Sequence, residues 1–160
     1  MLYDPNWKQT DTPSITRTDL SKRELKYLLQ VRGLLISGAI TSEHFEMNTF
    51  WGDTPKRTTI KALIKNCDSV GCIGGWMAAL ARTNTKSILS DSGFPEWVDQ
   101  IATDRFMSEY KWHYLFYPPS VVMLNARPEH AVIAIDNFLI GQKDPWQFMM
   151  KKEKGRKYAI

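Results

Sequence analysis

The stretch GCIGGWMAALA, residues 71–81, decides the fold class because it reads as a helix without a polar face. Its small residues form two stripes at helical spacing: Gly71, Gly75 and Ala79, and Gly74, Ala78 and Ala81. Each glycine costs a helix about 1 kcal/mol, and close packing of neighbouring helices offsets this cost. We therefore expect a central, buried helix over about residues 70–82, capped by Asp68 or Ser69.

The larger side chains of this helix predict the structural core. Five residues are expected to be buried in it: Cys72, Ile73, Trp76, Met77 and Leu80. A free cysteine behaves as a small hydrophobic residue in such a place. The alternative to this packing role is a chemical one. Cys67 and Cys72 could belong to a metal or redox site, or Cys72 could be a nucleophile.

Local signals place other helices around this one. Ser21 and Glu24 have the form of a capping box, and Gly38 is a suitable stop for a first helix. Residues 120–141 permit two interpretations, because VVML and AVIAI also suit short buried strands. Pro128 in a first helical turn and Gly141 at a C-terminal cap favour a helix.

Three further helices rest on weaker signals. One begins after Pro55 within residues 54–65, one opens at Pro95, and one after Asp104 carries Tyr114 and Tyr117. Pro118 ends the last of these. The sequence thus predicts a mainly α protein, a single compact domain of five to seven short helices around the helix at about 70–82, with little or no β-sheet.

The 160 residues, 43% hydrophobic and 24% charged, have the composition of a globular protein. We expect an extended N-terminal arm at 1–17 with the aromatic anchors Tyr3 and Trp7, a helical domain at 18–142, and a basic C-terminal segment at 143–160. No apolar run is long enough to span a bilayer, and the N-terminus lacks the pattern of a secretory signal. We therefore expect a cytoplasmic protein with no membrane partner.

The net charge of +4 is confined to the C-terminal segment, where six Lys or Arg oppose two carboxylates, and the rest of the chain is neutral. A second basic stripe lies within residues 56–65. Contacts with an anionic partner are expected from these two clusters: Lys56, Arg57, Lys61, Lys65, Lys151, Lys152, Lys154, Arg156 and Lys157. Such clusters predict weak, non-specific and salt-dependent binding of nucleic acid.

Neither a metal nor a cofactor is expected. A structural zinc site needs four ligands, whereas the chain offers two cysteines and three scattered histidines. The C-x4-C spacing of Cys67 and Cys72 also differs from the C-x-x-C spacing of redox pairs.

A nucleophilic cysteine is the alternative. Cys72 at a helix start, then His130, then Asp136 follow the chain order of papain-like peptidases, and their two stretches are superficially similar to the active-site stretches of that family. However, Trp76 lies four residues after Cys72 rather than one. If residues 128–140 form a helix, the match is accidental.

Motifs over about residues 45–141 resemble a group of small uncharacterised proteins of bacteriophages and bacteria. The motifs are Phe45-x-Met47, Trp51, Cys67-x4-Cys72-Ile73-Gly74-Gly75-Trp76, Leu115-Phe116-Tyr117-Pro118, and the stretch from His130 to Gly141. The resemblance implies a phage or prophage context and no established activity, so it supplies no catalytic residues. The extra Gly74 and the basic stretch at 54–65 depart from the pattern.

Three functions follow as hypotheses. The first is a non-enzymatic interaction protein of phage type that binds a host or phage macromolecule, with a protein partner expected. The second is a nucleic-acid-associated protein that uses the two basic clusters. The third is a cysteine-dependent hydrolase with Cys72, His130 and Asp136.

Overall fold

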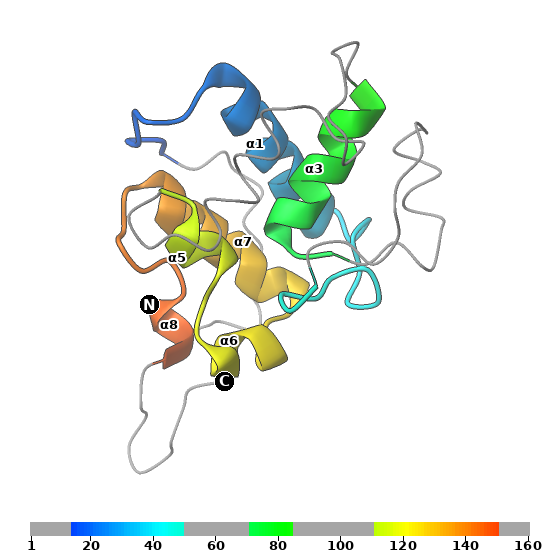
Figure 1. The fold of residues 1–160 in the computed structure, drawn as a ribbon, viewed down its shortest axis with the longest axis vertical. Helices are drawn as coiled ribbons and strands as arrows, with labels where there is room; N and C mark the ends of the chain where they lie inside the picture. The colour runs from blue at the N-terminus through cyan, green and yellow to red at the C-terminus, as the bar shows by residue number, and fades with distance from the viewer. Residues whose placement is uncertain (1–13, 50–70, 85–110, 151–160) are drawn as a thin grey trace.

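The computed structural model describes residues 14–49, 71–84 and 111–150, and these residues form six helices and no sheet. In chain order the helices are α1 (Lys22–Ile36), α3 (Ile73–Asn84), α5 (His113–Phe116), α6 (Ser120–Asn125), α7 (Pro128–Leu139) and α8 (Gln147–Met150) (Figure 1). An isolated β-bridge between Phe45 and Gly71 is the one extended pairing in the described residues. The prediction of a mainly α protein is confirmed.

Helix α1 begins and ends where its local signals predict. The Ser21 side chain accepts from the Glu24 backbone N–H at 3.1 Å, and the Glu24 carboxylate accepts from the Ser21 N–H at 2.8 Å. This reciprocal pair satisfies two N–H groups that the helix itself leaves unpaired. Gly38 lies at φ +78°, a left-handed conformation that glycine adopts without strain, and it ends the helical stretch.

Helix α3 begins at Ile73, slightly later than the expected start near residue 70, and the expected caps Asp68 and Ser69 lie outside the described residues. The cause is the β-bridge. The Gly71 N–H donates to His44 O at 3.2 Å, and Gly71 O accepts from Glu46 N at 3.1 Å. These bonds hold Gly71 in an extended conformation, and Cys72 becomes the residue that precedes the helix.

Residues 120–141 form helices rather than strands. Pro128 occupies the start of α7, where its missing N–H costs nothing, and Gly141 follows the helix at φ +84°. Helix α6 is short because Pro119 precedes it and Pro128 follows soon after its end. The expected places of Pro128 in the first helical turn and of Gly141 at the C-terminal cap are both confirmed.

Helices α1, α3 and α7 form the centre of the described structure. Helix α1 packs against both α3 and α7, and α5 packs against α7 (Figure 1). The Trp112 ring is stacked on the ring of Phe116 at 4.8 Å and on that of Phe138 at 5.1 Å, measured between centroids. This stack joins α5 to α7.

The packed region extends beyond residue 142, where the helical domain is expected to end. Trp146, Phe148 and Met149 are buried in the same core, and the indole N–H of Trp146 donates to Leu115 O at 2.9 Å. Residues up to Met150 are therefore part of the helical core, although the sequence places them in a basic segment.

Several expected elements fall outside the described residues. These are most of the N-terminal arm (1–13), the helix within 54–65, the helix that opens at Pro95, the part of the next helix that precedes Lys111, and the tail at 151–160.

Candidate interaction surface

The five residues expected in the core are all fully buried, with 0% of each side chain exposed: Cys72, Ile73, Trp76, Met77 and Leu80. Trp76 uses its polar atom inside the protein, because its indole N–H donates to His44 O at 2.8 Å. The central helix is thus enclosed around its first turns, as the absence of a polar face predicts.

Cys72 has a structural role at the start of α3. Its Sγ accepts a hydrogen bond from the Gly75 backbone N–H at 3.4 Å, and its carbonyl accepts from the Trp76 N–H at 2.9 Å. The thiol therefore caps the helix, a position that Ser, Thr or Asp usually occupies. The burial of Cys72 also separates its Sγ from solvent.

His130 also caps a helix. Its Nδ1 accepts from the Arg127 backbone N–H at 3.0 Å at the start of α7. Burial lowers the pKa of His130 below its ordinary value, which favours the neutral ring. With Nδ1 as the acceptor, the neutral ring carries its proton on Nε2, and no ring nitrogen remains to take a proton from a thiol.

Asp136 is engaged by Arg32 of α1. The guanidinium Nε lies 2.6 Å from Oδ1, and the second bond of the bidentate pair spans 3.3 Å to Oδ2. Burial raises the pKa of Asp136, although the Arg32 charge opposes the shift. Asp136 follows His130 by six positions on α7, which is about 9 Å along the axis and about 120° around it. The carboxylate therefore does not orient the imidazole as a hydrolase would require.

The nine basic residues expected to contact an anionic partner lie outside the described residues, at 56–65 and 151–157. Within residues 14–49, 71–84 and 111–150, no group of three or more His, Cys, Asp or Glu side chains is placed to hold a metal ion. None of the helices in the same ranges has both the length and the apolar character needed to cross a membrane.

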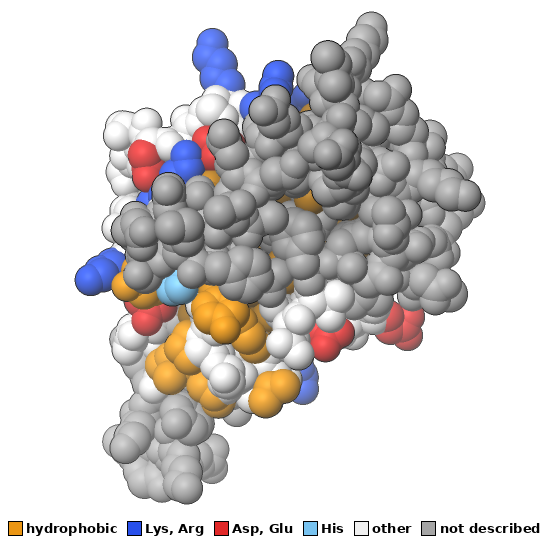
Figure 2. Space-filling model, viewed as in Figure 1, with side chains coloured by type: hydrophobic (Ala, Val, Ile, Leu, Met, Phe, Trp, Pro, Cys, Tyr) orange, Lys and Arg blue, Asp and Glu red, His pale blue; other side chains and the backbone are white. Residues whose placement is uncertain are grey.

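The described residues present an exposed apolar surface on α5 and α6. Tyr114 is 38% exposed, Tyr117 is 46% exposed, and Leu124 is 75% exposed, which is the largest value among the exposed large hydrophobic side chains of the described residues. Half-buried Val121 and Met123 belong to the same stretch. We call these five residues the α5–α6 surface. Figure 2 shows hydrophobic side chains gathered on the lower part of the molecule, where Figure 1 places α6 and α8.

The neighbours of these residues explain why the surface faces outward. Trp112, Leu115 and Phe116 of the same segment are buried in the core and fix which side of α5 faces inward. Tyr114 and Tyr117 then project from the opposite side. The Pro118–Pro119 pair separates α5 from α6, and Pro has few backbone conformations, so the two short helices are joined by a stiff link.

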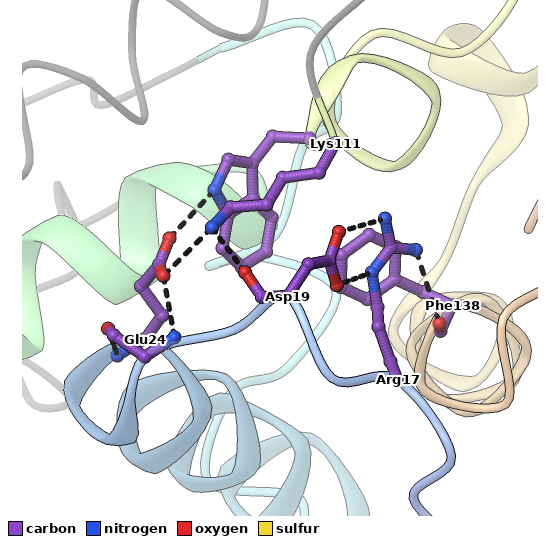
Figure 3. Close-up of polar contacts among 7 residues, drawn as sticks. Arg17, Asp19, Glu24, Lys111 and Phe138 are labelled. Atoms are coloured by element: carbon purple, nitrogen blue, oxygen red, sulfur yellow. Dashed lines mark hydrogen bonds and ion pairs between the residues drawn. The ribbon is translucent and has the colours of Figure 1, made fainter.

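A polar network holds the start of α5 against α1 (Figure 3). Lys111 Nζ lies 3.0 Å from Glu24 Oε1 and 2.7 Å from Asp19 O, and the Trp112 indole N–H donates to Glu24 Oε2 at 3.1 Å. Burial alone would raise the pKa of Glu24, but hydrogen bonds from Ser21 and Lys111 hold the pKa below its ordinary value. Glu24 is therefore ionised at neutral pH, and it anchors α5 through two residues.

The sequence did not single out this surface. The spacing of Tyr114 and Tyr117 groups them on one helix face, and such a stripe is more often part of a core. Two features of the sequence could have indicated this surface. The adjacent apolar residues Leu115 and Phe116 are candidates for the core in place of the two tyrosines, and the Pro118–Pro119 pair interrupts the helix.

Comparisons with known proteins do not place this chain, because no family model, no curated protein and no solved structure matches it.

Proposed function

We propose that the chain is a non-enzymatic binding protein whose α5–α6 surface contacts a protein partner. The resemblance to small phage and bacterial proteins adds the context to the proposal: a phage or prophage protein that acts on a host or phage macromolecule in the host cytoplasm.

The exposure of Tyr114, Tyr117 and Leu124 is the observation that carries the proposal. Tyrosine is enriched in protein interfaces, because its ring supplies contact area and its hydroxyl tolerates solvent when the partner is absent. An exposed apolar cluster is a liability for a free protein and marks an interaction site. Each Å² of this apolar area that a partner removes from water contributes about 25 cal/mol to association.

The rigidity of the surface supports the same proposal. Trp112, which precedes α5, is stacked on Phe116 of α5, and Lys111 ties the start of α5 to α1. A preorganised surface loses little conformational entropy when it binds, so more of the contact energy remains as affinity.

Affinity capture from host cells with a pair of variants tests this proposal. The full chain and the variant Ile15→Ser/Ile140→Ser, which removes exposed apolar groups elsewhere, should capture the same partner. The variant Tyr117→Ser/Leu124→Ser should lose at least about tenfold of the captured partner, since two apolar contacts exceed 1.4 kcal/mol. Equal capture by all three chains, with unchanged melting temperatures, would refute the proposal.

The alternative functions have different support. The nucleic-acid hypothesis rests on the charge of the two basic clusters in the sequence. Gel shifts of the full chain and of a chain without residues 151–160, at low and near-physiological salt, measure how much binding the tail supplies. The hydrogen bonds of Cys72, His130 and Asp136 give the hydrolase hypothesis no support.

A further inference from the structure

We propose that the exposed face at the start of α1 is a second contact surface, which binds the phosphate backbone of nucleic acid. Three basic residues of this helix form the face: Lys22, Arg23 and Lys26. They belong neither to the two basic clusters of the sequence nor to the α5–α6 surface. The inference therefore goes beyond the proposed function and does not depend on it.

The three basic residues lie on one side of the helix. Successive residues of an α-helix are rotated by about 100°, so Lys22 and Lys26 differ by about 40°, and Arg23 lies within about 100° of both. All three are exposed, whereas Leu28 and Val31 on the other side are buried in the core. Figure 2 shows Lys and Arg side chains that project from the upper edge of the molecule, where Figure 1 places the start of α1.

The two carboxylates next to this face are engaged by other residues (Figure 3). Both oxygens of Asp19 accept from the Arg17 guanidinium, at 2.6 and 3.0 Å, and the Glu24 carboxylate accepts from Lys111 Nζ at 3.0 Å. Residues 14–26 together with Lys111 carry five basic side chains against two carboxylates. The other side chains that the structure describes include three basic ones against five carboxylates, so positive charge is concentrated at this end of α1.

This arrangement of charges is unfavourable for the helix itself. The N-terminal end of a helix carries a partial positive charge, which repels Lys22 and Arg23 in the first turn. Lys22 and Lys26 also repel each other, because residues four positions apart are neighbours on a helix. An arrangement that opposes the local rules in this way is typical of a functional site. The capping box of Ser21 and Glu24 already satisfies backbone N–H groups here, so the proposed contact is made by the basic side chains.

Phosphates of nucleic acid suit this face better than a membrane or an acidic protein does. A helix that lies on a membrane needs exposed apolar side chains beside its basic ones, and α1 contributes none of the exposed large hydrophobic residues of the described structure. Basic side chains about 5–6 Å apart at Cβ fit a ligand with closely spaced charges. A DNA duplex carries one charge per about 1.7 Å of its axis, whereas an extended acidic peptide has at most one per residue, about 3.3 Å.

Lysine acetylation of the unmodified full chain tests the contact and locates it. The chain is acetylated briefly at near-physiological salt, with and without a DNA duplex at half-saturating concentration, and each lysine is followed by mass spectrometry. Acetylation of Lys22 and Lys26 is expected to slow about twofold, whereas exposed Lys143 should react at an unchanged rate. No slowing at Lys22 and Lys26, or equal slowing at Lys143, would overturn the proposal. Polyglutamate of equal total charge should slow the reaction less, and an equal effect would assign the face to an acidic protein instead.

The salt dependence of DNA binding is the second measurement. The variant Lys22→Gln/Lys26→Gln is compared with Arg127→Gln/Lys143→Gln, which removes the same charge from exposed positions elsewhere. Each phosphate contact contributes about 0.9 to the slope of log K against log salt concentration, so the first variant should lower the slope by about 1.8 and the second should leave it unchanged. Equal slopes of the two variants would overturn the proposal. Such a failure leaves the proposed function standing, because capture through the α5–α6 surface is measured separately.

Discussion

A Cβ atom added to Gly74 would lie 3.1 Å from two ring carbons of Phe116. The first turn of α3 therefore lies so close to α5 that a side chain added here would force the Phe116 ring to shift by a few tenths of an ångström. The Phe116 ring cannot easily move away, because it is buried and stacked on Trp112. This contact joins the central helix to the segment that carries the α5–α6 surface.

The first prediction compares two glycines that both lie within helices. Gly74→Ala is expected to lower the free energy of unfolding by about 1–3 kcal/mol, since overpacking outweighs the gain in helix propensity. Gly33→Ala in α1 has no atom within 4 Å of the added Cβ, and it should raise the free energy of unfolding by about 0.5–1 kcal/mol. Urea unfolding measures both values, and a stabilising effect of both substitutions would disprove the close contact.

Signals that act within a few residues made much of the fold predictable. The Ser21–Glu24 pair, Pro128 and Gly141 each act through their own backbone, so their effects on α1 and α7 follow from the sequence alone. The apolar character of residues 71–81 on every side likewise predicts a buried helix, whatever its neighbours are.

Contacts between distant residues could not be predicted in the same way. The start of α3 depends on bonds between Gly71 and residues 44–46, and Asp136 is paired with Arg32 from 104 positions away. The outward orientation of Tyr114 and Tyr117 depends on which neighbours fill the core. Each of these outcomes is decided by tertiary packing, which a single sequence does not show.

The second prediction concerns the buried ion pair between α1 and α7. Arg32→Met is expected to lower the free energy of unfolding by about 3 kcal/mol at pH 7, because it leaves the Asp136 carboxylate buried without its partner. The double variant Arg32→Met/Asp136→Leu should recover most of this loss. Urea unfolding of the three chains is the test, and equal stability of the two variants would contradict this account.

The pH dependence of the Arg32→Met variant gives a third prediction. The pKa of Asp136 is already raised by burial, and removal of the Arg32 charge raises it further. The folded variant then binds a proton at a higher pH than the unfolded chain does. The stability deficit should therefore shrink as pH falls below the raised pKa. A deficit that stays constant between pH 7 and pH 4 would show that Asp136 is not the cause.

The fourth prediction concerns His130, whose pKa is lowered by burial. As pH falls below about 6.5, the unfolded chain takes up a proton before the folded chain, so stability falls by up to about 1.4 kcal/mol per pH unit. His130→Gln keeps a side chain that can accept from the Arg127 N–H but does not titrate. It should remove this part of the pH dependence, whereas His130→Ala should be less stable at every pH.

Thermal unfolding of the three chains between pH 7.5 and 5 measures the effect. If the stability of the His130→Gln variant falls with pH as steeply as that of the unmodified chain, groups other than His130 cause the pH dependence.

Photo-cross-linking from the α5–α6 surface inside producing cells tests the central claim most directly. Benzoylphenylalanine is placed at position 117 in one chain and at position 140, also an exposed apolar site, in a second chain. The account predicts one discrete protein adduct from position 117 that position 140 does not give. Identical adducts from both positions, or no adduct from position 117, would contradict the assignment of this surface as the binding site.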